Sequence, residues 1–227
     1  MKWIKLQEID STNNYAKQRR GEGQSLIVTA QKQTGGRGTK GRCFSSNEGG
    51  VYLSALRFYK NFLAKDAFKI MSGAAVAVCE TLRFYGLNPV IKWSNDVLVG
   101  GKKICGILIE NTLSGDKISS SIVGIGLNVN NSLPEELLGL ATSIALETGK
   151  DPSVEEVTER LIEELEKERT MEEYRSYLGF MGEQVTLILE NKSVPATLVC
   201  VDDRGNLVAE IEGETKTFSS AEVSVRL

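Results

Sequence analysis

The segment from residue 90 to residue 129 places strand-like runs one after another with only tight turns between them. Its first three runs are Val90–Trp93, Val97–Val99 and Ile104–Asn111, separated by Ser94-Asn95-Asp96 and by Gly100-Gly101, and a fourth covers 118–129. Strands joined by such short turns pair antiparallel, because a parallel pair needs a crossover of about a dozen residues. The segment therefore predicts a mixed or largely antiparallel sheet, and it lacks the regular βαβα alternation of a doubly wound fold.

Helical patterns lie on both sides of this segment. We expect helices over about 13–20, over Ala64–Tyr85, near Pro134–Leu146 and across Ser153–Leu178. The second of these is followed by Gly86 and Pro89, residues that commonly end a helix. The sequence thus predicts an α+β domain, a mixed β-sheet with helices packed on one side.

The pattern changes after Gly182, where short β-prone runs alternate with polar turns. These runs are Val185–Glu190, Ser193–Asp202, Leu207–Ile211, Glu214–Phe218 and Val223–Val225, with a turn at Asn191-Lys192 between the first two. Short strands of this kind are stabilised by closing into a small barrel, because closure removes exposed strand edges. We therefore expect two domains, a larger one over residues 1–180 and a small β-barrel over residues 181–227.

Histidine is absent from the 227 residues. Its absence excludes Ser-His-Asp and Cys-His catalysis and zinc sites that use histidine. The balance of 27 basic against 30 acidic residues gives a net charge of −3, so no overall basic field for nucleic acid is expected. No run reaches the ~20 apolar residues of a membrane span, and the four cysteines form no C-x-x-C pair. We expect a cytoplasmic protein with free thiols and no membrane association.

A glycine-rich basic loop, Gly36-Arg37-Gly38-Thr39-Lys40-Gly41, satisfies the pattern G-x-G-x-x-G. A dinucleotide site needs a helix after this pattern, but the next predicted element is the strand 51–58. A Walker A loop would need Lys followed by Ser or Thr where Arg42 and Cys43 stand. Two interpretations remain open: an anion-binding loop that uses backbone N–H groups and guanidinium forks, or a surface loop with solubilising charge.

A second cluster joins Lys92-Trp93-Ser94-Asn95-Asp96 to Lys103 across two tight turns. Lys92 and Lys103 fall on adjacent strands, so their amines can converge on a substrate with several negative charges. Asp96 could orient a lysine or help to hold Mg²⁺ at a phosphate. The alternative is structural, with Asn95 and Asp96 forming an ordinary turn and the lysines protecting a sheet edge.

Taken together, the motifs resemble those of the biotin–protein ligases in order and spacing. They are Ser11-Thr12-Asn13, Gln33 with Gly36–Arg42, Lys92–Asp96, Lys103-Ile104-Cys105-Gly106-Ile107-Leu108-Ile109-Glu110, and Gly124-Ile125-Gly126-Leu127-Asn128-Val129. The resemblance covers essentially the whole chain, and it implies an SH3-like fold for the C-terminal barrel. It also implies the short form of the enzyme, without the N-terminal helix-turn-helix of the repressor-type members and therefore without DNA binding.

The resemblance implies an ATP-dependent ligase with two half-reactions. Biotin's carboxylate attacks the α-phosphorus of ATP to give biotinyl-5′-AMP and pyrophosphate, and a lysine amine of the biotin carboxyl carrier protein of acetyl-CoA carboxylase, or of a related biotin enzyme, then takes the biotin. Two like unit charges at ~4 Å repel by ~4 kcal/mol at an effective dielectric constant near 20, so cations must lie between carboxylate and triphosphate. Side-chain cations and Mg²⁺ would supply them.

By match to the motifs, the resemblance also assigns site residues. The biotin site would comprise Ser11, Thr12, Asn13, Gln33, Gly36, Arg37, Gly38, Thr39, Lys103 and Gly106; the ATP site Arg37, Arg42, Lys92, Asn95 and Asn128; and the catalytic group Lys103, Arg37, Lys92 and Asp96. Asp96 would position Lys92, hold Mg²⁺ or assist the incoming amine. Glycines 106, 124 and 126 would leave room for the valeryl chain and rings of biotin, since a Cβ there would intrude.

The chain departs from the family pattern at three places. Ser94 replaces a proline, Cys43-Phe44 replaces a basic residue followed by tryptophan, and Thr39 replaces a second arginine of the loop. Thr39 offers one uncharged hydroxyl instead of a five-donor fork. Either the intermediate is held more loosely than in arginine-bearing relatives, or Lys40, Arg42 or backbone N–H groups compensate. We also expect this loop to be mobile without ligand, because its like charges repel until an anion arrives.

Two other functions remain open. A lipoate or octanoate ligase would share the fold and the acyl-adenylate chemistry, and a non-enzymatic module would use the glycine-rich loop only to trap an anion. The sequence leaves open whether the chain is a monomer or a homodimer.

Overall fold

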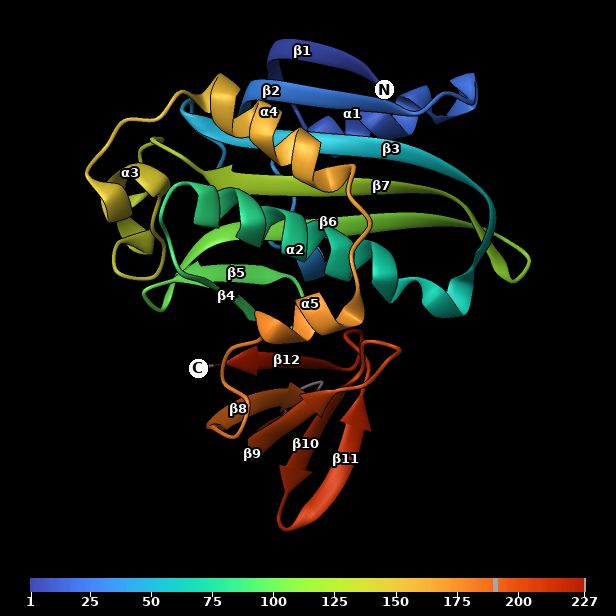
Figure 1. The fold of residues 1–227 in the computed structure, drawn as a ribbon, viewed down its shortest axis with the longest axis vertical. Coiled ribbons are helices and arrows are strands. Elements are labelled where there is room, and N and C mark those ends of the chain that lie inside the picture. The colour runs from blue at the N-terminus through green and yellow to red at the C-terminus, as the bar shows by residue number, and fades with distance from the viewer. Residues whose placement is uncertain (190–191, 227) are drawn as a thin grey trace.

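The computed structural model describes residues 1–189 and 192–226, and the side chain of Lys40 also lies outside the description. The larger unit is built on a seven-stranded sheet and the C-terminal unit on a five-stranded one. Figure 1 shows the C-terminal sheet below the larger unit, next to the short helix α5. The second sheet begins at β8 (Gln184–Leu189), and the expected division of the chain into domains near residue 180 stays a prediction.

The larger sheet has the strand order β1-β2-β3-β7-β6-β5-β4. Its strands are β1 (Lys2–Ile9), β2 (Leu26–Gln33), β3 (Gly50–Leu63), β4 (Pro89–Lys92), β5 (Asp96–Val99), β6 (Lys102–Ser114) and β7 (Lys117–Asn128). The β1–β2 pair is parallel and every other neighbouring pair is antiparallel. The prediction of a mixed sheet without βαβα alternation is confirmed.

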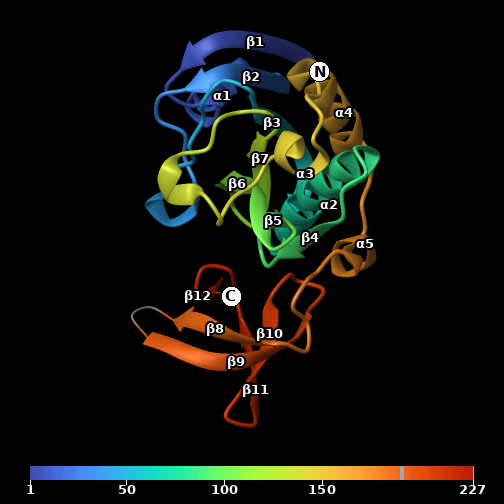
Figure 2. The same ribbon diagram turned by 90° about the vertical axis from the view of Figure 1, so that its left-hand side faces the viewer.

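Helices cover both faces of this sheet. The helices are α1 (Thr12–Gln18), α2 (Phe68–Phe84), α3 (Ile144–Thr148), α4 (Val154–Leu165) and α5 (Met171–Ser176). Helices α2 and α4 pack on one face, where their apolar residues join Leu53 and Ile125 in the main core. Helix α1 packs on the opposite face, where Ala16 meets Leu56 and Ile122 in a second cluster, and Figure 2 shows the two layers edge-on. The expectation of helices on one side therefore holds for α2 and α4 but not for α1.

Strand β3 explains how both faces can be covered. Its first seven residues are all buried, and because side chains alternate along a strand, Leu53 and Ser54 face opposite layers. Leu53 belongs to the α2 face, whereas Ser54 meets Thr12 and Asn13 at the start of α1. The buried Ser54 hydroxyl thus marks the face of β3 that carries the polar site.

The helices after β7 are shorter than the sequence suggested. The stretch expected to be helical near Pro134–Leu146 forms a 3₁₀ turn at Glu135–Leu137 and the short helix α3. The stretch Ser153–Leu178 divides into α4 and α5, because Thr170 starts a new helix with a capping box to Glu173. A capping box satisfies the free N–H groups of a helix start, so it fixes a helix boundary inside a continuously charged sequence.

The C-terminal sheet is antiparallel throughout and has the order β11-β10-β9-β8-β12. Its remaining strands are β9 (Lys192–Val201), β10 (Leu207–Ile211), β11 (Glu214–Phe218) and β12 (Val223–Arg226). Over the described residues β11 and β12 are the edges, and no pairing between them closes a barrel. The five strands expected from the sequence are present, while the turn expected at Asn191-Lys192 includes Asn191, which lies outside the described residues.

The four cysteines carry free thiols, as expected. Cys79 and Cys105 are buried, and burial raises the pKa of both thiols. Within the described part of the chain, no helix is both long enough and apolar enough to cross a bilayer.

Candidate active site

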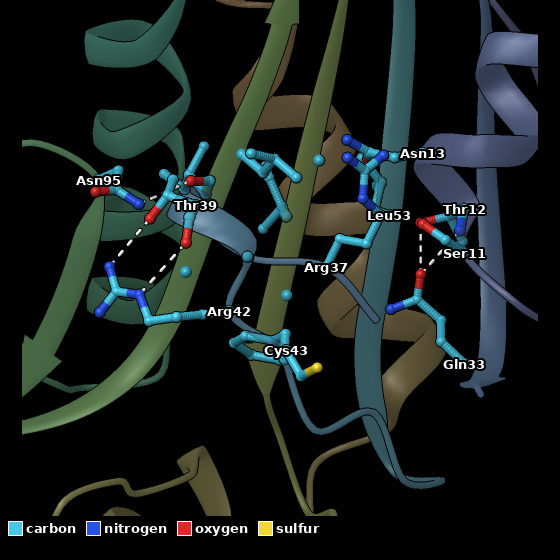
Figure 3. A pocket seen from close by; sticks show the side chains of 18 of the residues that line it. Ser11, Thr12, Asn13, Gln33, Arg37, Thr39, Arg42, Cys43, Leu53 and Asn95 are labelled. Carbon is cyan, nitrogen blue, oxygen red and sulfur yellow. Dashed lines mark hydrogen bonds between the residues drawn. The ribbon is translucent and has the colours of Figure 1, made fainter. Parts of the chain in front are cut away.

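One cavity, here called the sheet cavity, lies where the start of α1, the glycine-rich loop and the strands β3, β6 and β7 meet (Figure 3). Most of the residues predicted from the motifs line it. They are Ser11, Thr12, Asn13, Gln33, Arg37, Gly38, Thr39, Arg42, Asn95, Lys103 and Gly106. Segments up to about a hundred positions apart in sequence therefore converge on a single site, because adjacent antiparallel strands carry them there.

Three lining residues, Thr12, Asn13 and Gln33, form a neutral hydrogen-bonded group with Ser54, here called the polar network. Gln33 Oε1 accepts from the backbone N–H of Thr12 at 2.8 Å and from its hydroxyl at 3.0 Å. The Ser54 hydroxyl lies 2.8 Å from Thr12 Oγ1 and 2.5 Å from Asn13 Oδ1. Ser54, Thr12 and Asn13 are at most 4% exposed. Such a network presents fixed donors and acceptors to an uncharged polar ligand.

Glu110 connects the polar network to the glycine-rich loop. Its carboxylate accepts from Asn13 Nδ2 at 2.9 Å and from Arg37 Nη1 at 3.3 Å. Arg37 also donates to Asn14 Oδ1 at 3.2 Å. The guanidinium of Arg37 is therefore held at the α1 side of the cavity. An anion would have to bind the guanidinium more tightly than the Glu110 carboxylate does in order to displace it.

A charged group, here called the charged triad, lies at the other side: Lys92, Asp96 and Lys103. Lys103 Nζ lies 2.6 Å from Asp96 Oδ1, and Lys92 Nζ lies 3.8 Å from Asp96 Oδ2. Because Lys92 pairs with Asp96 across the β4–β5 hairpin and Asp96 pairs with Gly106 on β6, the sheet register brings the triad together. Burial lowers the pKa of Lys92 from its ordinary value, although the nearby Asp96 acts in the opposite direction.

Asp96 shares its two oxygens between two ammonium groups. This arrangement fits the predicted role of a residue that orients lysines. Among the described residues, no three side chains of a metal-binding type lie close enough to hold an ion. Magnesium is usually bound by one or two carboxylates together with phosphate oxygens of a nucleotide, so a role of Asp96 as a magnesium ligand stays a prediction.

The glycine-rich loop folds back on itself beside the triad. Arg37 and Cys43 form an isolated antiparallel bridge, and a 3₁₀ turn covers Thr39–Gly41. Arg42 donates to the carbonyl of Thr39 at 3.3 Å and to its hydroxyl at 3.1 Å, as Figure 3 shows. The side chain of Lys40, one of the predicted substitutes for an arginine at position 39, lies outside the described part. The expectation that the loop is mobile without ligand stays a prediction.

Three glycines of the strands make room for this chain's own side chains. A Cβ at Gly124 would lie 2.2 Å from Asn13 Oδ1, and one at Gly126 would lie 2.5 Å from the ring of Phe44. A Cβ at Gly106 would lie 3.2 Å from Lys103 Nζ. The space beside these glycines is occupied by residues of the site, and their role in leaving room for ligand rings stays a prediction.

Two residues from the sequence-based assignment are placed away from the cavity walls. Gly36 packs closely against the backbone of Phe44 within the loop, because a Cβ at Gly36 would lie 2.3 Å from the carbonyl oxygen of Phe44. Asn128 is buried, donates to the carbonyl of Thr142 at 2.9 Å and accepts from Asn131 at 3.2 Å. Asn95 lines the cavity, but its amide donates to the carbonyl of Ile107 at 2.9 Å.

Sequence reasoning missed three residues of the site. Ser54 links Thr12 to Asn13, Glu110 links Asn13 to Arg37, and Phe44 fills the space above Gly126. Ser54 could have been noticed as the hydroxyl residue inside the apolar run 51–56. Glu110 ends one of the family motifs, but nothing local indicates that it faces a basic residue 73 positions earlier.

A second, wider cavity lies between the two units, here called the interdomain cavity. It shares Thr39, Arg42 and Asn95 with the sheet cavity. Lys92 and Asp96 line it from the larger unit, and Arg204, Gly205, Asn206, Ser219 and Ser220 line it from the C-terminal unit. The triad therefore stands at the junction of the two cavities, with Lys103 on the sheet cavity and Lys92 and Asp96 on the wider interdomain cavity.

Comparisons with known proteins agree with this geometry. Residues 4–128 match the biotin/lipoate A/B protein ligase family, and residues 180–226 match the biotin protein ligase C-terminal domain. The chain is 32% identical over 222 residues to the bifunctional ligase/repressor BirA of Bacillus subtilis, which covers 89% of this chain and 66% of that protein. It is 31% identical over 238 residues to the BirA of Escherichia coli, covering 97% of this chain and 73% of that protein.

The fold is similar to that of a solved structure of the biotin protein ligase from Aquifex aeolicus in complex with biotin and ATP. The TM-score is 0.79 at 33% identity, over 99% of this chain and 98% of the other. The chain spans about two thirds of the length of the Bacillus relative, so the agreement concerns the shared ligase region. Motifs, fold and site geometry together place the chain in the biotin protein ligase family, within the biotin/lipoate A/B protein ligases.

Proposed function

We propose that this chain is an ATP-dependent biotin–protein ligase. In the first step an oxygen of the biotin carboxylate attacks the α-phosphorus of ATP, the bond to the β-phosphate breaks, and biotinyl-5′-AMP and pyrophosphate form. In the second step a lysine amine of an acceptor protein attacks the acyl carbon and AMP leaves. The observation that carries the proposal is that a buried neutral network and Lys103 of the charged triad line one cavity, while Lys92 and Asp96 of the triad line the adjoining interdomain cavity.

The polar network suits the ureido ring of biotin. That ring is uncharged and carries two N–H donors and a carbonyl acceptor, which need partners of both kinds when water is removed. Ser11, Thr12 and Gln33 supply both kinds close to one another. A purely apolar pocket, or a purely cationic one, would leave part of the ring without hydrogen bonds.

The charged triad suits the reacting groups. Lys103 stands beside Gly106, between the polar network and the interdomain cavity, where the far end of biotin's valeryl chain would reach. Its ammonium can hold the carboxylate and then the bridging acyl-phosphate oxygen, while Lys92 and Arg42 face the phosphates from the second opening. Fixed cations placed where negative charges meet lower the barrier without reorganisation during the reaction.

Asp96 acts in this scheme by orienting both lysines. Asp96 Oδ1 lies 2.6 Å from Lys103 Nζ. This short contact supports a role for Asp96 in holding the Lys103 ammonium at the junction of the two cavities. Magnesium would enter with the nucleotide and offset phosphate charge. The acceptor would be the carrier domain of acetyl-CoA carboxylase or of a related biotin enzyme, and a cytoplasmic location stays a prediction.

The experiment is pyrophosphate exchange into ATP, measured separately with biotin, lipoate and octanoate. Exchange reports formation of the acyl-adenylate without any acceptor protein. We expect exchange with biotin alone, followed by transfer to a purified carrier domain. Exchange supported by lipoate or octanoate instead would assign the chain to the other branch of its family, and binding of biotin without exchange would reduce it to a ligand-binding module.

A further inference from the structure

We propose that the β9–β10 turn of the C-terminal unit, residues 202–206, positions the charged triad for adenylation by holding Trp93. Gly205 and Trp93 are then positioning residues, which act through Lys92 and Asp96 without touching substrate. The inference deepens the proposed function and rests on it. It gives the C-terminal unit a role in the first half-reaction, before any acceptor protein binds.

Trp93 joins the two units by a buried hydrogen bond. Its indole Nε1 donates to the carbonyl oxygen of Gly205 at 3.0 Å, across 112 positions of sequence. Trp93 itself is only 5% exposed. A buried indole N–H that lost this acceptor would be left without a partner, so the contact is costly to break. The neighbouring residue in the chain is Lys92, a member of the triad.

Gly205 approaches the larger unit more closely than any side chain would allow. A Cβ there would lie 1.9 Å from the ring of Phe68 at the start of α2, and the residue has a φ of +83°. Glycine is therefore required both by its left-handed backbone and by the contact. The turn around it is internally fixed, because Asp202 accepts from the N–H groups of Arg204 and Asn206 at 2.9 and 2.8 Å.

The segment that carries the triad is held from a second side by α5. The hydroxyl of Tyr174 donates to the carbonyl of Ser94 at 3.0 Å, and the Tyr174 ring packs edge-on against Phe68 with centroids 5.3 Å apart. Phe68 is thus in contact with both Gly205 and Tyr174. The turn between β4 and β5 is thereby fixed at Trp93 and at Ser94, between the two residues whose side chains form ion pairs with each other.

A shift of this turn would move Lys92 and Asp96 together, and Lys103 would lose the carboxylate that orients it. The polar network would be unaffected, because its residues lie on α1, β2 and β3. A disturbed turn should therefore slow adenylation and leave the affinity for biotin nearly unchanged. A displacement of the order of 1 Å at a reacting group can cost about 10²-fold in rate.

The test compares Gly205→Ala with Gly213→Ala in the full chain. Gly213 lies in the β10–β11 turn of the same sheet, has a φ of +82°, and a Cβ there would meet nothing within 4 Å. Both variants carry the same left-handed backbone penalty, but only the first disturbs the contact with Phe68 and Trp93. Measurements are thermal unfolding, biotin affinity by calorimetry, and kcat and KM for biotin-dependent pyrophosphate exchange.

We expect Gly205→Ala to lower the exchange kcat by about tenfold or more, with biotin affinity within about twofold of the unaltered chain. Gly213→Ala should lose less stability, because it carries only the backbone penalty, and it should keep normal kinetics. If both variants lose kcat equally, or if biotin affinity falls in proportion to kcat, the turn is only structural and the proposal is overturned.

Trp93→Phe keeps the test open if Gly205→Ala does not fold. It retains an aromatic ring and removes only the N–H donor, and we expect the same separation between kcat and biotin affinity. Where both single variants fold, the exchange kcat of the double variant Gly205→Ala/Trp93→Phe should be little lower than that of either single variant, because both substitutions break the same contact. Additive losses would contradict the proposal. A chain whose unaltered form shows no exchange with biotin would instead refute the proposed function.

Discussion

The two halves of the site, the polar network and the charged triad, are built in opposite ways. The polar network of Thr12, Asn13, Gln33 and Ser54 is neutral, and Ser54 is fully buried. In the charged triad the side chains of Lys92 and Lys103 are 23% and 36% exposed, around an Asp96 whose side chain is 11% exposed. Buried neutral groups must satisfy one another when no ligand is bound, whereas cations can be stored half in water beside one carboxylate.

The difference indicates what each half recognises. A preformed neutral network selects a ligand by the arrangement of its donors and acceptors, because a mismatched ligand leaves buried groups unpaired. The triad has one more positive than negative charge, and this excess charge is neutralised when an anion binds. We therefore expect changes in the network to act on biotin affinity and changes in the triad to act on rate.

The largest effect is expected for Lys103→Ala, which should abolish biotin-dependent pyrophosphate exchange and leave the unfolding temperature unchanged. Lys103 is the cation of the triad that lines the sheet cavity, so its loss leaves the carboxylate and phosphate to repel each other. Lys102→Ala, one residue earlier on the same strand and exposed, serves as the control. Exchange within about threefold of the unaltered chain would remove Lys103 from the reaction.

A smaller effect is expected for Ser54→Ala, which should weaken biotin binding about 5- to 150-fold, because Thr12 and Asn13 lose a shared buried partner worth ~1–3 kcal/mol. The exchange kcat at saturating biotin should change little. Ser121→Ala is the matched control, since Ser121 is equally buried and its hydroxyl has no partner among the described residues. A fall in kcat with unchanged affinity would break the proposed division of labour.

A pH effect is expected at Lys92. Burial lowers its pKa, so its positive charge is lost, as pH rises, earlier than that of an exposed lysine. Pyrophosphate exchange should therefore decline on the alkaline side. Once Lys92 has lost its proton, the site, which also holds Lys103, Arg42 and Asp96, carries one positive charge fewer to offset the phosphates. Lys92→Arg should move this decline to higher pH, because arginine stays protonated.

The control for this pH profile is Lys65→Arg, which changes an exposed lysine of the interdomain cavity. It should leave the alkaline decline where it was. A decline that Lys92→Arg does not move would show that another group sets the limit, and the triad would then lose one of its two proposed cations.

The smallest effect is expected at Thr39. Its hydroxyl and carbonyl both accept from Arg42, which supports compensation by Arg42 for the arginine missing at position 39. Thr39→Val should speed release of biotinyl-5′-AMP about fivefold, as loss of one hydrogen bond of ~1 kcal/mol predicts. Thr39→Ser should behave like the unaltered chain.

Release of the adenylate and labelling of bystander lysines would be measured for these variants and for Thr39→Arg. If Thr39→Arg slows release and reduces bystander labelling, the looser hold expected from the sequence is real despite Arg42. If it changes neither, position 39 does not gate the intermediate, and its role is confined to orienting Arg42.

Much of this protein could be predicted from the sequence, because the decisive signals are local. Tight turns between the runs of 90–129 required antiparallel neighbours, and the strand order and most strand bounds agree with them. The glycine-rich loop and the motif that begins at Lys103 belong to a set of motifs in the order and spacing of the family. That order predicted both the family and most of the residues that line the sheet cavity. The absence of histidine by itself excluded whole classes of catalytic chemistry.

Tertiary structure decided what depends on contacts between distant residues. Ser54 enters the network because β3 faces α1 at that position, Glu110 meets Arg37 across 73 positions, and Trp93 meets Gly205 across 112. Sheet register brought Asp96 between its two lysines, and the packing of Phe44 on Gly126 filled space that the sequence had suggested for ligand. Local patterns specify turns and strand faces, but partners so far apart are chosen only when the sheets and helices pack.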